Sequence, residues 1–332
     1  MTGCAAQVQL GGPLIPRDGM KARFSSGSAG MCAIRAPGDV VCWQRPDDKE
    51  HMVEIGIKDA IEISVGDEHA CALRSTGHVV CWGKNDQAQL GRPDGDIALV
   101  MGVADAVRVV VSTDDSTCAL EKSGKIRCWG DNSGLVDNGP RRLSTATLVP
   151  GIEDAIDLAR APGLVCALHR GGAVSCWGQA QGTPVPTRIE GISDAVQVSA
   201  SGIMACARLA TGRIQCWLHP LQTQSFGVSD RYKQIHAPDV TDAADVMVSW
   251  ANVCVRKGTP TGPLVCAGGE FDDVFLEREL SAFDGAEAVA PMSTKLIFCG
   301  VDKAGGIIST PETTGFCGED TLLTDAAGNV LR

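Results

Sequence analysis

The feature that most limits the fold is a pair of cysteines that recurs along the chain with a nearly constant internal spacing. In five copies the second cysteine lies ten residues after the first, and a glycine lies six residues after the first. The five pairs are Cys32 with Cys42, Cys71 with Cys81, Cys118 with Cys128, Cys166 with Cys176, and Cys206 with Cys216. A repeat with a period of a few tens of residues indicates an array of similar units, so it decides the fold before any single motif does.

Each pair is expected to join the two strands of a β-hairpin. A separation of ten residues, folded about its midpoint, places Cys71 opposite Cys81, with residues 75–77 as a three-residue turn. Gly77 falls where such a turn needs a positive φ angle, and the flanking runs are short and β-prone. Opposed residues of antiparallel strands project from one face, close enough for a disulfide. Trp82, the next residue, is expected on the opposite face.

A further strand is expected before each hairpin, marked by an acidic, a small and an apolar residue in succession. Clear copies begin at Asp59, Asp105, Asp154 and Asp194, and weaker ones near Asp18, Asp242 and Asp284. A unit of roughly 40 to 48 residues with three or four short strands has the size of one blade of a β-propeller. Seven units predict an all-β fold, a single seven-bladed β-propeller over residues 18–332 that follows a tail at residues 1–17.

The last two cysteine pairs depart from the regular spacing. Cys254 and Cys266 are twelve residues apart, and Cys299 and Cys317 are eighteen apart. We still pair them, which predicts a cross-strand disulfide in each blade. Zinc sites would need close Cys-x-x-Cys or histidine pairs, which are absent, whereas buried free thiols are a real alternative. The strict opposition across each turn favours disulfides, each worth about 2.8 kcal/mol for an eleven-residue loop, and therefore an oxidising, extracytoplasmic compartment.

One unit carries the repeat most completely. It reads Gly-Asp-Glu-His-Ala-Cys-Ala-Leu at 66–73, Val-Val-Cys-Trp-Gly-Lys-Asn at 79–85 and Gln-Leu-Gly at 89–91. This pattern resembles the repeat of the regulator of chromosome condensation family, and the resemblance extends over nearly the whole chain. That family includes a eukaryotic nucleotide exchange factor that binds chromatin and a bacterial secreted propeller that inhibits β-lactamase. Propellers serve many activities, so the resemblance implies the fold more strongly than the function, and partner choice is expected in the diverged loops.

Charge and motifs exclude several classes of function. A net charge of −11 and a pI near 5.0 argue against nucleic acid as a partner, because that binding depends on neutralising phosphates with lysine and arginine. No apolar run is long enough to span a bilayer. Motifs for a catalytic nucleophile, a phosphate loop, a zinc helix or an EF-hand are missing, so we expect neither a cofactor nor a metal.

Seven pairs leave Cys4 without a partner. It lies in Met-Thr-Gly-Cys-Ala-Ala at residues 1–6, which resembles the processing site of a bacterial lipoprotein, where the cysteine becomes the acylated first residue. The alternative is an unpaired cysteine in a frayed terminus. A lipid anchor at Cys4 is the only membrane contact we expect, and both alternatives fit a secreted, periplasmic or cell-surface protein.

Acidic loops are the first candidate binding site. Asp67 and Glu68 precede one hairpin, and Asp114 and Asp115 precede the next. Loops between the first and second strands all open on the same face of the ring, so neighbouring blades are expected to bring these carboxylates together for acid/base chemistry, cation binding or partner binding. Acidic loop tips are more often simply solvated. His69 is expected to be a structural hydrogen-bonding residue.

Aromatic residues in the loops are the second candidate site. Trp43, Trp82, Trp129, Trp177 and Trp217 follow pairing cysteines and are expected to pack between blades. Trp250, with Asn252 beside it, lies in a loop on the face of the acidic loops, where it contacts a partner or else covers the sixth blade. Phe226 and Tyr232 lie in a long connector at 218–239. A second connector, at 270–284, contains a run spaced like a short amphipathic helix at 274–280.

These observations favour a protein that binds, tethers or inhibits a partner protein through one face of the propeller. An enzyme that uses carboxylates at the propeller mouth, a hydrolase or a lyase, is the alternative. A nucleotide exchange factor is disfavoured by the cysteine chemistry and the acidic balance.

Overall fold

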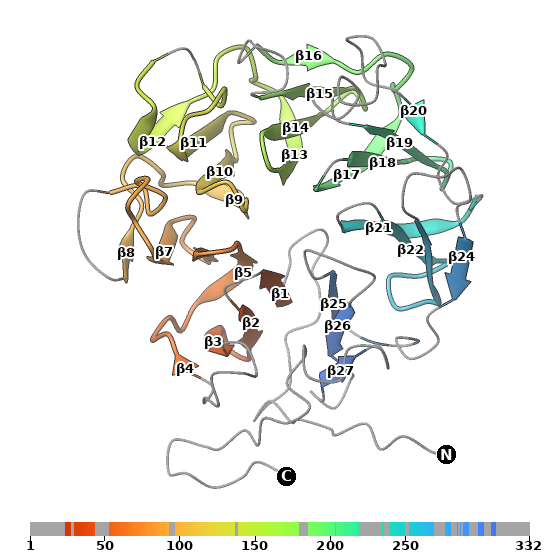
Figure 1. Cartoon of the computed structure of the whole chain (residues 1–332), viewed down its shortest axis with the longest axis horizontal. Coiled ribbons are helices and arrows are strands. Elements are labelled where there is room, and N and C mark those ends of the chain that lie inside the picture. Colours follow the sequence, from red (N-terminus) through yellow and green to blue (C-terminus); the bar gives the residue numbers. More distant parts are fainter. Residues whose placement is uncertain are drawn as a thin grey trace, which may run out of the picture.

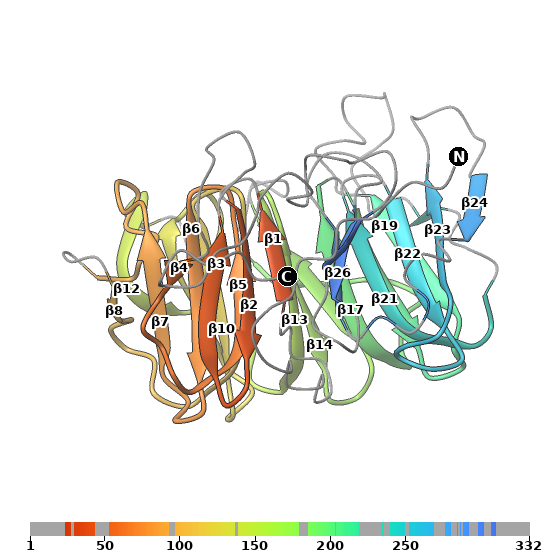
Figure 2. The same cartoon turned by 90° about the horizontal axis from the view of Figure 1, so that it is seen from below.

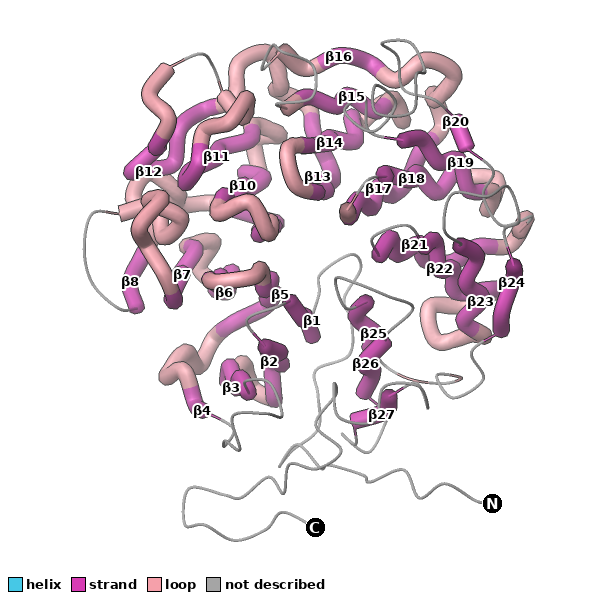
Figure 3. Tube along the Cα trace, viewed as in Figure 1, coloured by secondary structure: helices cyan, strands magenta, loops and turns pink. Residues whose placement is uncertain are grey.

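The computed structural model of the chain is all-β over the residues that it describes. These are residues 24–27, 30–43, 53–92, 97–136, 139–178, 185–202, 204–218, 234–235, 240–249, 252–268, 276–279, 284, 286, 288–291, 298–301 and 307–309. Their strands form seven separate antiparallel sheets, six with four strands and one with three. Figures 1 and 3 show the sheets arranged around a common centre, which is the arrangement of a β-propeller.

Each sheet is made of strands that follow one another in the chain. Sheet 1 contains β1 (Phe24–Gly27), β2 (Gly30–Arg35), β3 (Asp39–Trp43) and β4 (Val53–Glu54). Sheet 2 contains β5 (Ala60–Val65), β6 (His69–Arg74), β7 (Val79–Gly83) and β8 (Ile97–Leu99). Sheet 3 contains β9 (Ala106–Val111), β10 (Ser116–Glu121), β11 (Ile126–Asp131) and β12 (Arg142–Leu148).

The remaining sheets repeat this plan. Sheet 4 contains β13 (Ala155–Ala161), β14 (Leu164–His169), β15 (Val174–Trp177) and β16 (Thr187–Arg188). Sheet 5 contains β17 (Ala195–Ser201), β18 (Met204–Leu209), β19 (Ile214–Leu218) and β20 (Gln234–Ile235). Sheet 6 contains β21 (Ala243–Ser249), β22 (Asn252–Lys257), β23 (Leu264–Gly268) and β24 (Leu276–Glu279), and sheet 7 contains β25 (Ala288–Pro291), β26 (Phe298–Val301) and β27 (Ile307–Ser309).

The predicted hairpin geometry is confirmed. Cys71 pairs with Cys81 across β6 and β7, and Gly77 has a φ angle of 81° in the turn between them. A Cβ atom on Gly77 would also lie 3.0 Å from the Ala104 carbonyl oxygen, so both the backbone angle and this close contact disfavour a larger residue. Six disulfides form, between Cys32 and Cys42, Cys71 and Cys81, Cys118 and Cys128, Cys166 and Cys176, Cys206 and Cys216, and Cys254 and Cys266.

The seventh pair and the tail are not tested by the structure. Cys299 lies in β26, whereas Cys317 lies outside the described residues, so their pairing stays a prediction. Cys4 and the rest of residues 1–17 lie outside them as well. Among the residues that the structure describes, no helix could cross a membrane.

The core lies between neighbouring sheets. Cys71 and Cys81 face sheet 3, where they share one buried cluster with Ala119 and Trp129. The opposite face of sheet 2, which includes Trp82, packs against sheet 1. Trp129 is fully buried, as are Trp177 and Trp217. The predicted packing role of the repeated tryptophan is therefore confirmed at these three positions, and Trp82 is partly buried.

Buried polar residues connect the inner strands from sheet to sheet. Arg108 of β9 lies 3.1 Å from a carboxylate oxygen of Glu62 in β5 and 2.5 Å from one of Asp157 in β13. Asp157 also accepts a hydrogen bond of 3.2 Å from the Val198 amide in β17. All three charged residues are the third of an inner strand, where a bulge interrupts the register in each of the three sheets. We call Glu62, Arg108 and Asp157 the inner network.

The expected helix at residues 274–280 is wrong. Residues 276–279 form β24, the outer strand of sheet 6, where Leu276 pairs with Gly268. Apolar spacing over so few residues fits a helix and a strand equally. A strand is favoured here because the backbone groups at the outer edge of β23 need hydrogen-bond partners, which β24 supplies.

Candidate binding face

The loops that follow β5, β7 and β9 open at one face of the propeller, because successive strands of a sheet alternate in direction. Figure 2 shows the strands running between the two faces, with loops at both ends. Glu68 lies in the loop between β5 and β6 and accepts a hydrogen bond of 2.5 Å from the Lys84 ammonium group. Lys84 also lies 3.4 Å from an Asp86 carboxylate oxygen. The hydrogen bond that Lys84 donates to Glu68 is the main cause of a raised Lys84 pKa.

Asp115 extends this group of charges to the next sheet. Its carboxylate accepts a hydrogen bond of 3.1 Å from the Gln89 side-chain amide, and its φ angle is 58°. Burial raises the Asp115 pKa, and the negative charges of Glu68 and Asp86 raise it further. The structure therefore brings carboxylates of neighbouring sheets into one electrostatic group, which we call the acidic cluster: Glu68, Asp86 and Asp115.

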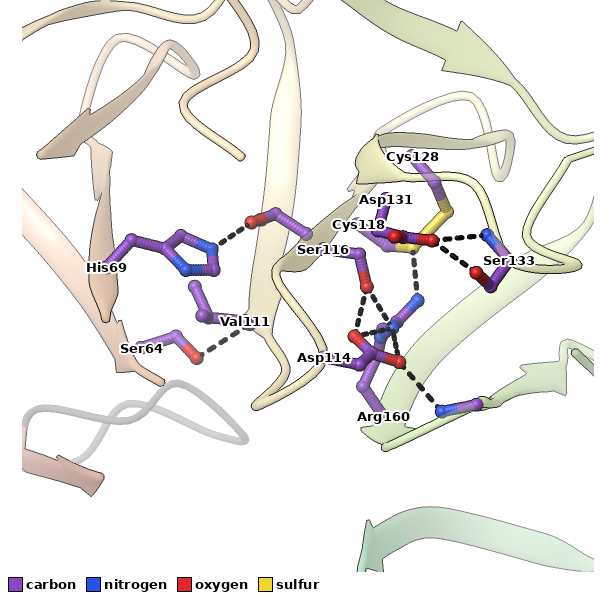
Figure 4. A network of polar contacts seen from close by, with 12 residues as sticks. Ser64, His69, Val111, Asp114, Ser116, Cys118, Cys128, Asp131, Ser133 and Arg160 are labelled. Atoms are coloured by element: carbon purple, nitrogen blue, oxygen red, sulfur yellow. Dashed lines mark hydrogen bonds and ion pairs between the residues drawn. A yellow bond between two sulfur atoms is a disulfide. The ribbon is translucent and has the colours of Figure 1, made fainter. Parts of the chain in front are cut away.

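Asp114 has a different environment from its neighbour. Its carboxylate lies 2.8 and 3.0 Å from one nitrogen of the Arg160 guanidinium, and it accepts a hydrogen bond of 2.7 Å from the Gly163 amide. The Ser116 hydroxyl donates to the same carboxylate (Figure 4). The Arg160 side chain is fully buried, so this ion pair connects the loop of sheet 3 to sheet 4. Asp114 thus joins two sheets, a structural role.

His69 has the structural role that the sequence predicts. Its ring Nε2 lies 2.7 Å from the Thr117 hydroxyl of sheet 3, within a buried hydrogen bond that Figure 4 shows. Only 2% of the residue is exposed, and burial lowers the His69 pKa to about 4. The ring is therefore neutral at neutral pH and stabilises the contact between sheets 2 and 3.

The other predicted candidates are placed unevenly. Asp67 is partly exposed in the loop beside Glu68. Asn252 is the first residue of β22 and is 8% exposed, so it is a buried residue of the sheet. Trp250, Phe226 and Tyr232 lie outside the described residues, and their roles stay predictions.

Two residues of the face are not among the sequence candidates. Lys84 and Asp86 follow the third strand of sheet 2, and this strand ends at the same face as the loop before β6. Strand direction alone could have placed them there. Lys84 lies close to both Glu68 and Asp86. The described part of the chain contains no group of three histidine, cysteine, aspartate or glutamate residues that could hold a metal ion.

The fold and the repeated hairpins define a β-propeller whose loops gather charged side chains at one face. A family model described as the regulator of chromosome condensation (RCC1) repeat matches residues 60–89 and 107–134. The chain therefore carries RCC1-like repeats, and the resemblance in the sequence is confirmed. No curated protein matches the sequence.

Solved structures share this fold. Yeast RCC1 (Prp20), solved with Kap60 bound, has a TM-score of 0.66 and 16% identity, and the match covers 95% of this chain and 91% of that chain. Human WBSCR16 has a TM-score of 0.64 and 13% identity, with coverage of 90% and 89%. The CRINKLY WD40 ectodomain of the Arabidopsis thaliana receptor kinase ACR4 has a TM-score of 0.54 and 18% identity, with coverage of 88% and 94%. At these identities the likeness concerns the fold alone.

Proposed function

We propose that this protein is an extracytoplasmic binding protein that holds a partner protein at the face of the acidic cluster, and so tethers or inhibits it. A general protein-binding role is supported by the RCC1-like propeller fold. Yeast Prp20, which shares the fold, was solved with Kap60 bound, and its binding properties to Gsp1p and histones are described. The partner of the present chain is expected to differ, since the two chains are only 16–20% identical.

The gathering of Glu68, Asp86 and Asp115, carboxylates of two neighbouring sheets, beside the single cation of Lys84 is the observation that carries the proposal. Burial is the main cause of the raised Asp115 pKa, and the negative charges of Glu68 and Asp86 raise it further, by more than Lys84 lowers it. A lysine or arginine side chain from a partner would stabilise all three carboxylates at once. We therefore expect the partner to present basic residues, and we expect salt to weaken the complex.

The compartment follows from the cysteines. Six disulfides, nearly all of them buried, fit an oxidising environment. Secretion and acylation of Cys4 belong to the proposal. Mass spectrometry of the protein taken from its native membrane would test the anchor, because an acylated Cys4 would form the first residue of the mature chain.

Capture of partners from the envelope fraction of the source organism tests the binding face. The immobilised chain is compared with a triple variant, Glu68→Gln with Asp86→Asn and Asp115→Asn, and with Glu153→Gln. Glu153 is an exposed carboxylate that precedes β13, at the opposite face. We expect a partner that the original chain and Glu153→Gln retain equally and that the triple variant retains about tenfold less, a difference of about 1.4 kcal/mol.

Two results would contradict the proposal. Equal retention by the triple variant would remove the acidic cluster from the binding face. Recovery of no partner by any of the three chains would argue against the binding function itself.

A further inference from the structure

The six disulfides differ in how well the protein covers them. In five of them every cysteine is at most 1% exposed: Cys71, Cys81, Cys118, Cys128, Cys166, Cys176, Cys206, Cys216, Cys254 and Cys266. In sheet 1, Cys32 is 3% exposed and Cys42 is only partly buried. Cys42 is thus the most exposed sulfur-bearing residue of the six disulfides.

A leucine and a tryptophan cover the disulfide of sheet 2. Leu90, from the segment after β7, is 1% exposed and lies in the buried cluster that contains Cys71, Cys81 and Trp129. The Trp129 indole of sheet 3 donates a hydrogen bond of 2.9 Å to the carbonyl oxygen of Gln89, directly before this leucine. The leucine and the tryptophan of the next sheet together exclude solvent from the disulfide.

The same cover recurs one sheet further on. Leu135, after β11, is 1% exposed, and the fully buried Trp177 of sheet 4 donates a hydrogen bond of 2.8 Å to its carbonyl oxygen. Leu135 and Trp177 belong to one buried cluster with Cys118 and Cys128. The arrangement of leucine and tryptophan is therefore shared by sheets 2 and 3.

In sheet 1 the corresponding tryptophan is less deeply buried than in sheets 2 and 3. Trp82 of sheet 2 takes the place of Trp129, but it is only partly buried, at the margin of the cluster that includes Cys32 and Cys42. Val53 pairs with Cys42, hence shares its face, and is 55% exposed.

We propose that the Cys32–Cys42 disulfide is a thiol–disulfide exchange site for an external thiol or dithiol. The external thiolate attacks the Cys42 sulfur, a mixed disulfide forms at Cys42, and the disulfide bond breaks with Cys32 as the departing thiolate. A second thiol of the reductant then attacks the mixed disulfide and releases the Cys42 thiolate. The reductant is oxidised to its disulfide, and the Cys32–Cys42 pair is reduced by the same two electrons.

Reduction of the Cys32–Cys42 disulfide is expected to affect mainly sheet 1. The pair joins β2 to β3 in sheet 1, the first sheet of the ring, while the other buried disulfides keep their sheets stapled. Strand β1 of the same sheet lies beside β25 and β26 of sheet 7, where the two ends of the ring meet (Figure 1). A reduced pair would therefore loosen the sheet next to the closure of the ring.

Differential alkylation of the folded, full-length protein tests the site. The protein is incubated with dithiothreitol in native buffer, and free thiols are blocked at timed intervals with one alkylating reagent. After denaturation and complete reduction, a second reagent labels the remaining cysteines, and peptide mass spectrometry gives the order of reduction. Cys118 and Cys128 form the matched control, because they have the same separation of ten residues.

We expect Cys32 and Cys42 to be labelled about tenfold faster than Cys118 and Cys128, because exchange rates follow access to the sulfur. Simultaneous labelling of all pairs would show that reduction needs unfolding of the whole chain, and it would overturn the proposal. Faster labelling of any covered pair would overturn it as well.

Two variants test the cause of the difference. Leu90→Ala is expected to raise the reduction rate of Cys71–Cys81 and to leave that of Cys118–Cys128 unchanged. Leu135→Ala is expected to do the reverse. If neither variant changes the reduction rate of its own disulfide, cover by neighbouring side chains does not set that rate, and the partial exposure of Cys42 does not explain its reactivity. The outcome is independent of the acidic face, because no partner protein takes part.

Discussion

The inner network and the acidic cluster use the same residue types in two opposite ways. In the inner network, Glu62 and Asp157 are at most 1% exposed, and Arg108 lies between them. In the acidic cluster, Glu68 and Asp86 are exposed, and their charges act on Asp115 more than Lys84 compensates. Opposite charges buried inside the ring connect the sheets, whereas the three carboxylates at the face outnumber the one lysine beside them.

The largest expected effect is the loss of the inner network's cation. Arg108→Met leaves Glu62 and Asp157 buried without their shared partner, and we expect it to lower the free energy of unfolding by about 3–5 kcal/mol. Urea denaturation measures the change. The control is Lys58→Met. It removes the ion pair of 3.5 Å between the exposed Lys58 and Asp39, and we expect it to lower the free energy of unfolding by at most about 1 kcal/mol. Equal losses in the two variants would mean that the buried inner network contributes no more to stability than an exposed ion pair.

His69 predicts a pH dependence of the interior. Its pKa is about 4 in the folded chain and near 6.5 in the unfolded chain, so the unfolded chain takes up the proton first as the pH falls. The contribution of His69 is complete above pH 6.5 and is lost between pH 6.5 and about 4, which amounts to about 3 kcal/mol. Urea denaturation of the original chain and of His69→Gln at several pH values measures it.

The control for His69 is the histidine in the turn of the same hairpin. His78 is partly exposed and contacts Thr76 across the turn, so His78→Gln is expected to leave the pH profile unchanged. If His69→Gln keeps the full loss of stability between pH 6.5 and 4, another group is responsible.

The sequence predicts what depends on local spacing. The opposition of Cys71 and Cys81 and the turn at Gly77 follow from separations of ten residues or fewer, so they could be placed in advance. The partners of Arg108 could not, because Glu62 and Asp157 belong to other sheets and meet it only once the ring has formed.

The loop of Asp114 and Asp115 shows the same limit of prediction from sequence for single residues. Asp114 and Asp115 are adjacent residues of the same type, yet only Asp114 forms an ion pair with the buried Arg160. The sequence therefore indicates the loop as a candidate site. Which of its two carboxylates is structural and which is available for binding depends on the side chains that the next sheet places beside Asp114 and Asp115.

Trp250 tests whether the binding face extends beyond the acidic cluster. If Trp250 contacts the partner, Trp250→Ala is expected to weaken the complex by about 2 kcal/mol or more, since truncation of an interfacial tryptophan is among the most costly. Calorimetric titration with the captured partner measures the change, and Glu153→Gln again serves as the control. Unchanged affinity together with lower thermal stability would mean that this tryptophan covers sheet 6 instead.

The smallest expected effect is an increase in the free energy of unfolding, on replacement of Asp115. Because the folded state raises the Asp115 pKa, the ionised carboxylate destabilises the fold above that pKa, and stability falls as the pH rises through it. Asp115→Asn is therefore expected to stabilise the chain at neutral pH by less than about 1 kcal/mol, since solvent screens these charges. Asparagine also tolerates the positive φ of this position.

Asp114→Asn provides the contrast one residue away. It removes the charge that pairs with the buried Arg160, so we expect it to destabilise the chain under the same conditions. Urea denaturation at neutral pH and near pH 3 compares the two variants, and the gain from Asp115→Asn is expected to disappear at the lower pH, where the carboxyl group is protonated. Destabilisation by Asp115→Asn at neutral pH would show that Asp115, like Asp114, stabilises the fold, and the acidic cluster would lose the feature that marks it as a binding site.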